Sequence, residues 1–212
     1  MIEEVVIEEV QENDWGDIRW LYFNGFSTIF GDKTVQNYNH SRRQNHLVAR
    51  IGQCLVGFGS YCSGSDDLDL SMRSFSELKA VHDCDKDRIN KFLQGYVEMI
   101  RYGGEVSVEL YDNEVTQSLS NRDLAEIIIR GQDFYLTNLV VSPRFQRRGI
   151  GKKLAEERIK IAKKSGSKIA YVSCIEGRHS LSIYQRLGFS PVIRLKPGYP
   201  DGSAAVRLLK IL

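Results

Sequence analysis

Residues 143–153 combine two glycines with five basic side chains, and this combination suits the binding of a phosphate group. The sequence there reads Pro-Arg-Phe-Gln-Arg-Arg-Gly-Ile-Gly-Lys-Lys, and Gly149 and Gly151 stand at the expected start of a helix. Glycine lets a ligand approach the backbone closely, and the unpaired N–H groups at a helix start attract anions. A pyrophosphate fits such a turn.

Two familiar nucleotide-binding loops are excluded by their spacing. A Walker loop needs glycine where Gln146 stands and Ser or Thr where Lys153 stands, and the dinucleotide fingerprint needs glycine where Leu154 stands. ATP hydrolysis and NAD binding are therefore not supported. What remains is the pattern Gln-x-x-Gly-x-Gly, which is followed further along the chain by Tyr-Gln-Arg-Leu-Gly-Phe at residues 184–189.

The elements that must position this turn form a strand, helix, strand unit. Apolar periodicity and glycine stops predict strands at 135–141 and 169–174 and helices at about 149–164 and 180–187. This spacing favours parallel pairing of the two strands. Nearer the start of the chain we expect a strand at 4–10 and a helix at 13–26. A hairpin with a II′ turn is expected to follow, with its two strands at 46–51 and 54–61.

Residues 134–190 resemble the cofactor-binding half of the GCN5-related N-acetyltransferase (GNAT) superfamily. Three elements carry the resemblance, in the family's order: Leu-Thr-Asn-Leu-Val-Val-Ser-Pro at 136–143, Gln146 to Gly151, and Tyr184-x-x-x-Gly188-Phe189. The resemblance implies an α/β (α+β) fold with a mixed, largely antiparallel central sheet, a parallel splayed strand pair and flanking helices. The length of 212 residues predicts one domain over residues 1–212, in which the resemblance places the cofactor-binding core at 134–190.

The resemblance further implies acetyl-coenzyme A as the co-substrate. No metal is expected, because the sequence has no Cys-x-x-Cys pair and only four histidines. Backbone groups at the splayed strand end would pair with the pantetheine arm; these belong to Leu139, Val140 and Val141. Amides of the turn would hold the pyrophosphate; these belong to Gln146, Arg147, Arg148, Gly149, Ile150, Gly151 and Lys152. Tyr184 would donate a proton to the departing thiolate. The alternative is that Tyr184 is only an aromatic residue of the core.

The residue that takes the proton from the amine is left open by the sequence. Glu176, His179, a residue of the segment before the core and a chain of waters are the candidates. Departures from the family pattern occur nearby, because Gly177 stands where many members have Asn. Val172 stands where enzymes that act on ribosomal-protein N termini carry an acidic residue, so this substrate class loses support.

Charge is unevenly distributed along a chain whose formal net charge is only +2. Residues 134–212 carry 16 Lys and Arg against 4 Asp and Glu, whereas residues 62–133 carry 8 against 15. The basic segment implies a polyanionic partner, and the phosphates of coenzyme A account for it. Nucleic acid is disfavoured, because the basic residues at 152–168 are not interleaved with aromatic residues.

The acidic stretch at about 62–133 is interpreted as an insertion, partly helical at about 85–101 and 123–129. Its carboxylates could flank a site for a cationic amine.

No apolar run is long enough to span a membrane, and the first ten residues are acidic where a signal peptide would be basic, so we expect a cytoplasmic protein. The cysteines lack a Cys-x-x-Cys pair, which predicts reduced thiols, with Cys54 and Cys174 buried.

The function expected is acetyl transfer from acetyl-coenzyme A to a primary amine of a small molecule, such as a polyamine, an aminoglycoside or an amino-sugar. Two other classes of function stay open. One is a protein or peptide N-acetyltransferase; the other is a non-enzymatic module that senses acetyl-coenzyme A or binds nucleic acid. The sequence also leaves a homodimer open.

Overall fold

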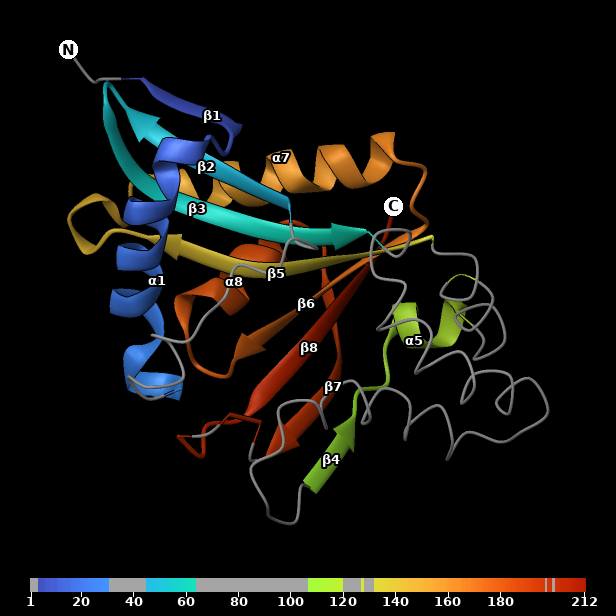
Figure 1. Cartoon of the computed structure of the whole chain (residues 1–212). Helices are drawn as coiled ribbons and strands as arrows, with labels where there is room; N and C mark the ends of the chain where they lie inside the picture. Colours follow the sequence, from blue (N-terminus) through green and yellow to red (C-terminus); the bar gives the residue numbers. More distant parts are fainter. Residues whose placement is uncertain are drawn as a thin grey trace.

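Eight strands form one mixed sheet in the computed structural model, which describes residues 4–30, 45–63, 107–119, 127, 132–196, 198–199 and 201–212. The strands are β1 (Val5–Glu9), β2 (Asn45–Ile51), β3 (Cys54–Ser63), β4 (Ser107–Leu110), β5 (Asp133–Val141), β6 (Ile169–Ile175), β7 (Ser190–Lys196) and β8 (Ala205–Ile211). Their order is β1-β2-β3-β5-β6-β8-β7-β4 (Figure 1). Only β5 and β6 pair in parallel, so the predicted fold class is confirmed.

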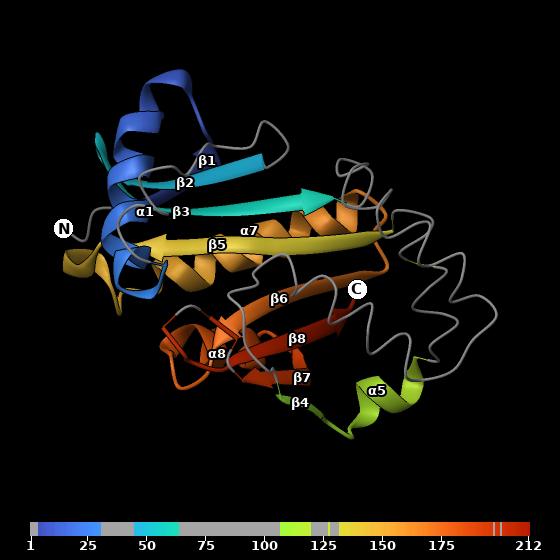
Figure 2. The same cartoon turned by 60° about the horizontal axis from the view of Figure 1, so that its bottom comes forward.

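Helices cover both faces of the sheet. They are α1 (Trp15–Phe30), α5 (Glu114–Ser118), α7 (Ile150–Lys164) and α8 (His179–Arg186), with short 3₁₀ turns η1 (Glu12–Asp14) and η2 (Pro143–Phe145). Successive strand residues point to opposite faces, so Val48 packs beneath α1 while Leu47 and Ala49 pack with the α7 side of the core. Figure 2 shows α1 and α7 on opposite sides of β3 and β5.

A two-residue turn joins β2 to β3. Gly52 has a φ of 56°, the left-handed backbone that the expected hairpin turn needs at its first position. Cys54 directly follows this turn and is exposed, so the expectation that it is buried was wrong. Cys174 is buried as predicted, with 3% of its surface exposed.

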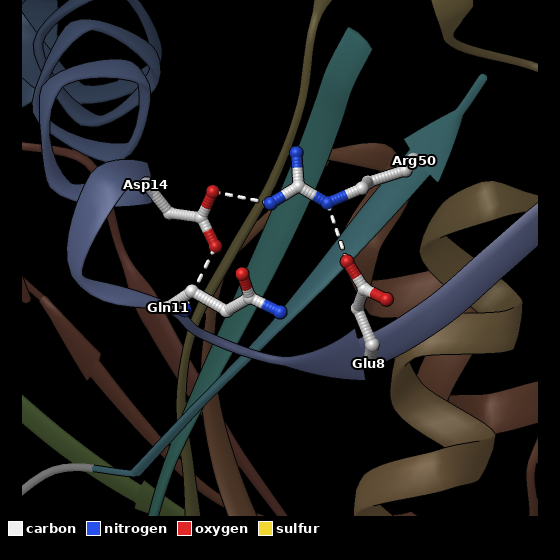
Figure 3. A network of polar contacts seen from close by, with 4 residues as sticks. All are labelled: Glu8, Gln11, Asp14 and Arg50. Carbon is white, nitrogen blue, oxygen red and sulfur yellow. Dashed lines mark hydrogen bonds and ion pairs between the residues drawn. The ribbon is translucent and has the colours of Figure 1, made fainter. Parts of the chain in front are cut away.

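A partly buried ion-pair network fixes the chain at the entry to α1 (Figure 3). The Arg50 guanidinium on β2 donates to the carboxylates of Asp14 and Glu8, and these bonds raise the pKa of Arg50. The Gln11 N–H donates to the second oxygen of Asp14 at 2.8 Å. Asp14 is only 4% exposed, so its charge depends on Arg50 for compensation. The network holds η1, and with it the start of α1, against the sheet.

Part of the stretch 62–133 belongs to the sheet. Strand β4 pairs antiparallel with β7, with Val108 opposite Leu195. Asn113 caps α5 by accepting the Val115 and Thr116 N–H groups. The helix expected at about 85–101 lies outside the described residues. Of the helix expected at 123–129, only residue 127 is described. Within the described ranges, no helix is long and apolar enough to cross a membrane.

Candidate active site

The parallel pair β5 and β6 opens partway along its length. The two strands pair from Asp133 with Ile169 to Leu136 with Val172. Beyond this point β5 continues alongside β3 to Val141, whereas β6 continues alongside β8 (Figure 1). We call this diverging part, residues 137–141 and 173–175, the splay. Among the strands that the structure describes, none pairs with the backbone groups on its inner side.

A bulge in β5 lies where the splay begins. Leu139 is opposite Gly59 and Leu136 is opposite Tyr61, so Ser60 of β3 faces two residues of β5 instead of one. An extra residue of this kind bends its strand and strengthens the local twist. The bulge at residues 137 and 138 therefore turns β5 away from β6.

The strand register decides which backbone groups face the inside of the splay. The Ser142 N–H donates to the Val56 carbonyl at 2.8 Å. Bonded and non-bonded residues alternate along an antiparallel pair, so Val140 also faces β3, and the N–H and C=O groups of Leu139 and Val141 face the splay. The Gln146 side chain donates to the Val141 carbonyl at 3.0 Å. Of the three strand residues predicted to meet pantetheine, Leu139 and Val141 have their backbone groups on the open side.

The turn that follows β5 has the backbone of an anion site. Arg147 has a φ of 61°, and among the described residues no other residue except glycine has a positive φ. Gly149 has a φ of 79°. Left-handed backbone at a residue with a large side chain is uncommon and costs free energy. Gly149 is the N-cap of α7 and has no side chain to bond the first N–H groups of the helix. These N–H groups and the positive helix end favour an anion.

Space for that anion exists at Gly149. A Cβ built on this residue would meet no atom within 4 Å. The basic residues of the turn and of the first helical turn are exposed; they are Arg144, Arg147, Arg148, Lys152 and Lys153. Arg148 lies over the Phe145 ring at 5.3 Å. Phosphate groups bound here would meet cationic side chains as well as helix amides.

Gly151 marks the place where three predicted pieces of the site meet. A Cβ on this residue would lie 3.5 Å from Ile183 Cδ1, 3.7 Å from Val141 Cγ2 and 3.9 Å from Leu139 Cδ2. These contacts bring the end of β5, the start of α7 and the helix α8 together.

Tyr184 lies on the buried side of α8. It is 1% exposed and packs edge-on against Phe189, with ring centroids 5.4 Å apart. Its hydroxyl oxygen accepts a hydrogen bond from Arg158 Nη2 at 2.7 Å. Burial raises the pKa of the Tyr184 phenol, and Arg158 opposes this effect. The phenol is therefore protonated at neutral pH.

Arg158 is a buried residue of the site that the sequence interpretation missed. Its side chain comes from α7 and is 0% exposed. Besides Tyr184, the guanidinium donates to three backbone carbonyls: Leu154 at 3.2 Å, Ser60 at 2.9 Å and Asn138 at 3.0 Å. It thus links the bulge of β5 to Tyr184. An arginine among the apolar positions of a helix, beside Leu154, Ala155 and Ala162, was the signal that could have revealed it.

Gly59 makes room for this arginine. A Cβ on Gly59 would lie 2.9 Å from Arg158 Nε and 3.0 Å from Cζ. Glycine at this position therefore leaves the space that the guanidinium occupies.

The other candidates are less suited to acid–base work. Both oxygens of Glu176 accept bonds from Arg194, at 2.7 and 2.8 Å, and these bonds lower the pKa of Glu176. His179 is the exposed first residue of α8. Burial raises the pKa of the Cys174 thiol to about 12, so this thiol is a poor nucleophile. Among the described residues no group of three His, Cys, Asp or Glu could hold a metal ion.

The chain belongs to the family of the acetyltransferase (GNAT) domain, whose model matches residues 84–210. It is therefore an N-acetyltransferase by class, and the predicted family and enzyme class are confirmed. A search of the curated proteins finds no match.

Solved structures share the fold at low sequence identity. The ribosomal-protein-S18-alanine N-acetyltransferase from Escherichia coli has a TM-score of 0.58 and 14% identity, covering 98% of this chain and 94% of that one. An acetyltransferase from Bacillus subtilis in complex with CoA has a TM-score of 0.54 and 16% identity, covering 99% of each chain. NAA60 from Arabidopsis thaliana in complex with a bisubstrate analogue has a TM-score of 0.55 and 12% identity, also covering 99% of each.

Proposed function

We propose that this protein transfers an acetyl group from acetyl-coenzyme A to a primary amine of a small molecule. The observation that carries the proposal is the joint geometry of the splay and the turn at Gly149. The splay offers the backbone of Leu139 and Val141, and the turn offers unpaired helix amides beside exposed Arg and Lys side chains. A thioester with a phosphate-bearing tail matches these two features in one ligand.

The chemistry that these residues support is direct acyl transfer. The thioester supplies the acetyl group; as the amine forms its C–N bond and the C–S bond breaks, the electron pair goes to sulfur. Tyr184 is protonated and can give its proton to that sulfur. Backbone N–H groups on the inner side of the splay can stabilise the oxyanion that forms on the carbonyl.

The proposal of a small acceptor rests on the charge of residues 62–133, which carry 15 Asp and Glu against 8 Lys and Arg and could attract a cationic amine. The pairing of β4 with β7 closes the edge of β7 to an added peptide strand, while β4 itself ends the sheet. A protein or peptide acceptor is the alternative, which the experiment below tests.

The first experiment is thermal unfolding with and without acetyl-coenzyme A. A ligand that binds only the folded state stabilises it by about 2.7 kcal/mol at one hundred times its dissociation constant, so the midpoint should rise clearly. If millimolar acetyl-coenzyme A left the midpoint of unfolding unchanged, acetyl-coenzyme A would not be the acetyl donor. Release of free thiol is then measured with a panel of polyamines, aminoglycosides and amino-sugars and, separately, with peptide pools. Turnover with peptides alone would refute the small acceptor.

A further inference from the structure

Within the described part of the chain, the buried guanidinium of Arg158 has only neutral oxygens as hydrogen-bond partners. Four of its N–H bonds go to three backbone carbonyls and to the Tyr184 hydroxyl. Burying a cation without an opposing carboxylate costs free energy, because carbonyl dipoles replace water incompletely. An apolar residue on this face of α7 would avoid that cost. A buried positive charge is favourable, however, where negative charge develops during a reaction.

The structural contacts of Arg158 account for only part of its geometry. Nη1 donates to the carbonyls of Ser60 and Asn138, and so satisfies the backbone at the bulge. Nη2 is directed instead to Tyr184 Oη, at 2.7 Å. The bulge does not need this second bond.

The bond to Nη2 also restricts the tyrosine proton. Arginine only donates hydrogen bonds, so in this pair Oη must be the acceptor. The O–H of Tyr184 then points away from Arg158. The guanidinium therefore restricts the O–H bond of Tyr184 to directions away from Arg158. If the proton left, the guanidinium would still lie beside the negatively charged oxygen.

We propose that Arg158 is a positioning residue for the proton donor: it aims the Tyr184 O–H at the departing sulfur and stabilises the charge left on Oη. The inference rests on the acetyl transfer proposed above. When the C–S bond breaks, sulfur takes the electron pair and the Tyr184 proton. The phenolate that remains is held by Nη2, and it is reprotonated by the proton that the new amide nitrogen releases. No other reactant is needed.

A double-mutant cycle tests this role. Tyr184→Phe should lower kcat by about 10²-fold, because it removes the acid. Arg158→Lys and Arg158→Gln should each lower kcat by about tenfold or more in the wild-type background. In the Tyr184→Phe background the same changes should lower kcat by less than about twofold, since no proton is left to position. The affinity for acetyl-coenzyme A should change little in any of these variants.

Ile159→Ala serves as the matched control, since it also removes a buried side chain from α7. It should lower the melting temperature, and its effect on kcat should be the same in both backgrounds. If the effects of Arg158→Lys and Tyr184→Phe on kcat multiply, as a purely structural role requires, the inference is wrong. It is also wrong if Tyr184→Phe leaves kcat unchanged. Failure of wild-type protein to bind acetyl-coenzyme A would instead overturn the proposed function.

If Arg158→Gln fails to fold, Gly59→Ala provides a second route to the same test. Its Cβ would approach Nε to 2.9 Å and displace the guanidinium while keeping the charge. The expected result is again a loss of kcat that disappears in the Tyr184→Phe background. A loss that persists undiminished there would count against the inference.

Discussion

The carboxylate of Glu176 stands at the end of β6 but is held by another residue. Its hydrogen bonds from Arg194 lower its pKa, so it is ionised at neutral pH and is a weak proton acceptor. The folded-state pKa lies below the unfolded value of about 4.3. The pair therefore stabilises the protein above that value, and this contribution is lost as the pH falls through the folded-state pKa.

Replacing Glu176 separates its two possible roles. Glu176→Gln should keep kcat within about twofold of wild type between pH 6 and 9, because a general base would contribute at least 10²-fold. The melting temperature of the variant should lie slightly below that of wild type at pH 7, and the difference should shrink as the pH falls through the lowered pKa of Glu176. A hundredfold loss of kcat, with loss of its pH dependence on the acid side, would identify Glu176 as the base.

Among single residues, those of the turn at 143–153 and Tyr184 could be proposed from the sequence, because each lies in a short local pattern. Arg158 could not, since its role depends on contacts made through folding. Its partner Ser60 is 98 positions away, and its bond to Tyr184 spans 26 positions. Nothing near Arg158 in the chain says which backbone carbonyls will lie beside it.

At the scale of elements, the turn between β5 and α7 makes a sharp prediction. Gly149→Asp should abolish binding of coenzyme A, because a carboxylate would occupy the space that phosphate needs. Gly149→Asn is the matched control, since asparagine tolerates left-handed backbone and is nearly the same size. It should bind coenzyme A more weakly than wild type but measurably by calorimetry. Equal binding by wild type and the Asp variant would refute this phosphate site.

Helix and strand positions around this turn were predictable because their apolar residues repeat at regular intervals. The helix expected at about 149–164 is Ile150–Lys164, and the strand expected at 169–174 is Ile169–Ile175. The bulge of β5 and the strand β4 were not predicted. A bulge is defined by its partner strand, and β4 is only 4 residues long, too short for a periodic pattern.

At the scale of the whole molecule, positive charge is concentrated in residues 134–212, and five of these basic residues belong to the turn at 143–153. Binding of coenzyme A should therefore weaken with salt, by about tenfold between 50 and 500 mM sodium chloride, because the Debye length shortens from about 14 to 4 Å. Titration calorimetry across this range provides the measurement. Pantetheine, which lacks the phosphates, is the control and should show no such dependence. Salt-independent binding of coenzyme A would remove the electrostatic argument.

The position of β8 in the sheet has a consequence for how the protein forms during translation. This strand, Ala205–Ile211, lies between β6 and β7 and pairs with both. Until β8 has left the ribosome, β6 lacks its strand partner on the side away from β5. Strand β7, with β4 attached, then has no described strand that joins it to the rest of the sheet. The half of the sheet formed by β6, β8, β7 and β4, against which α8 and Tyr184 pack, can therefore close only after β8 has been made, whereas β1, β2 and β3 can pair earlier.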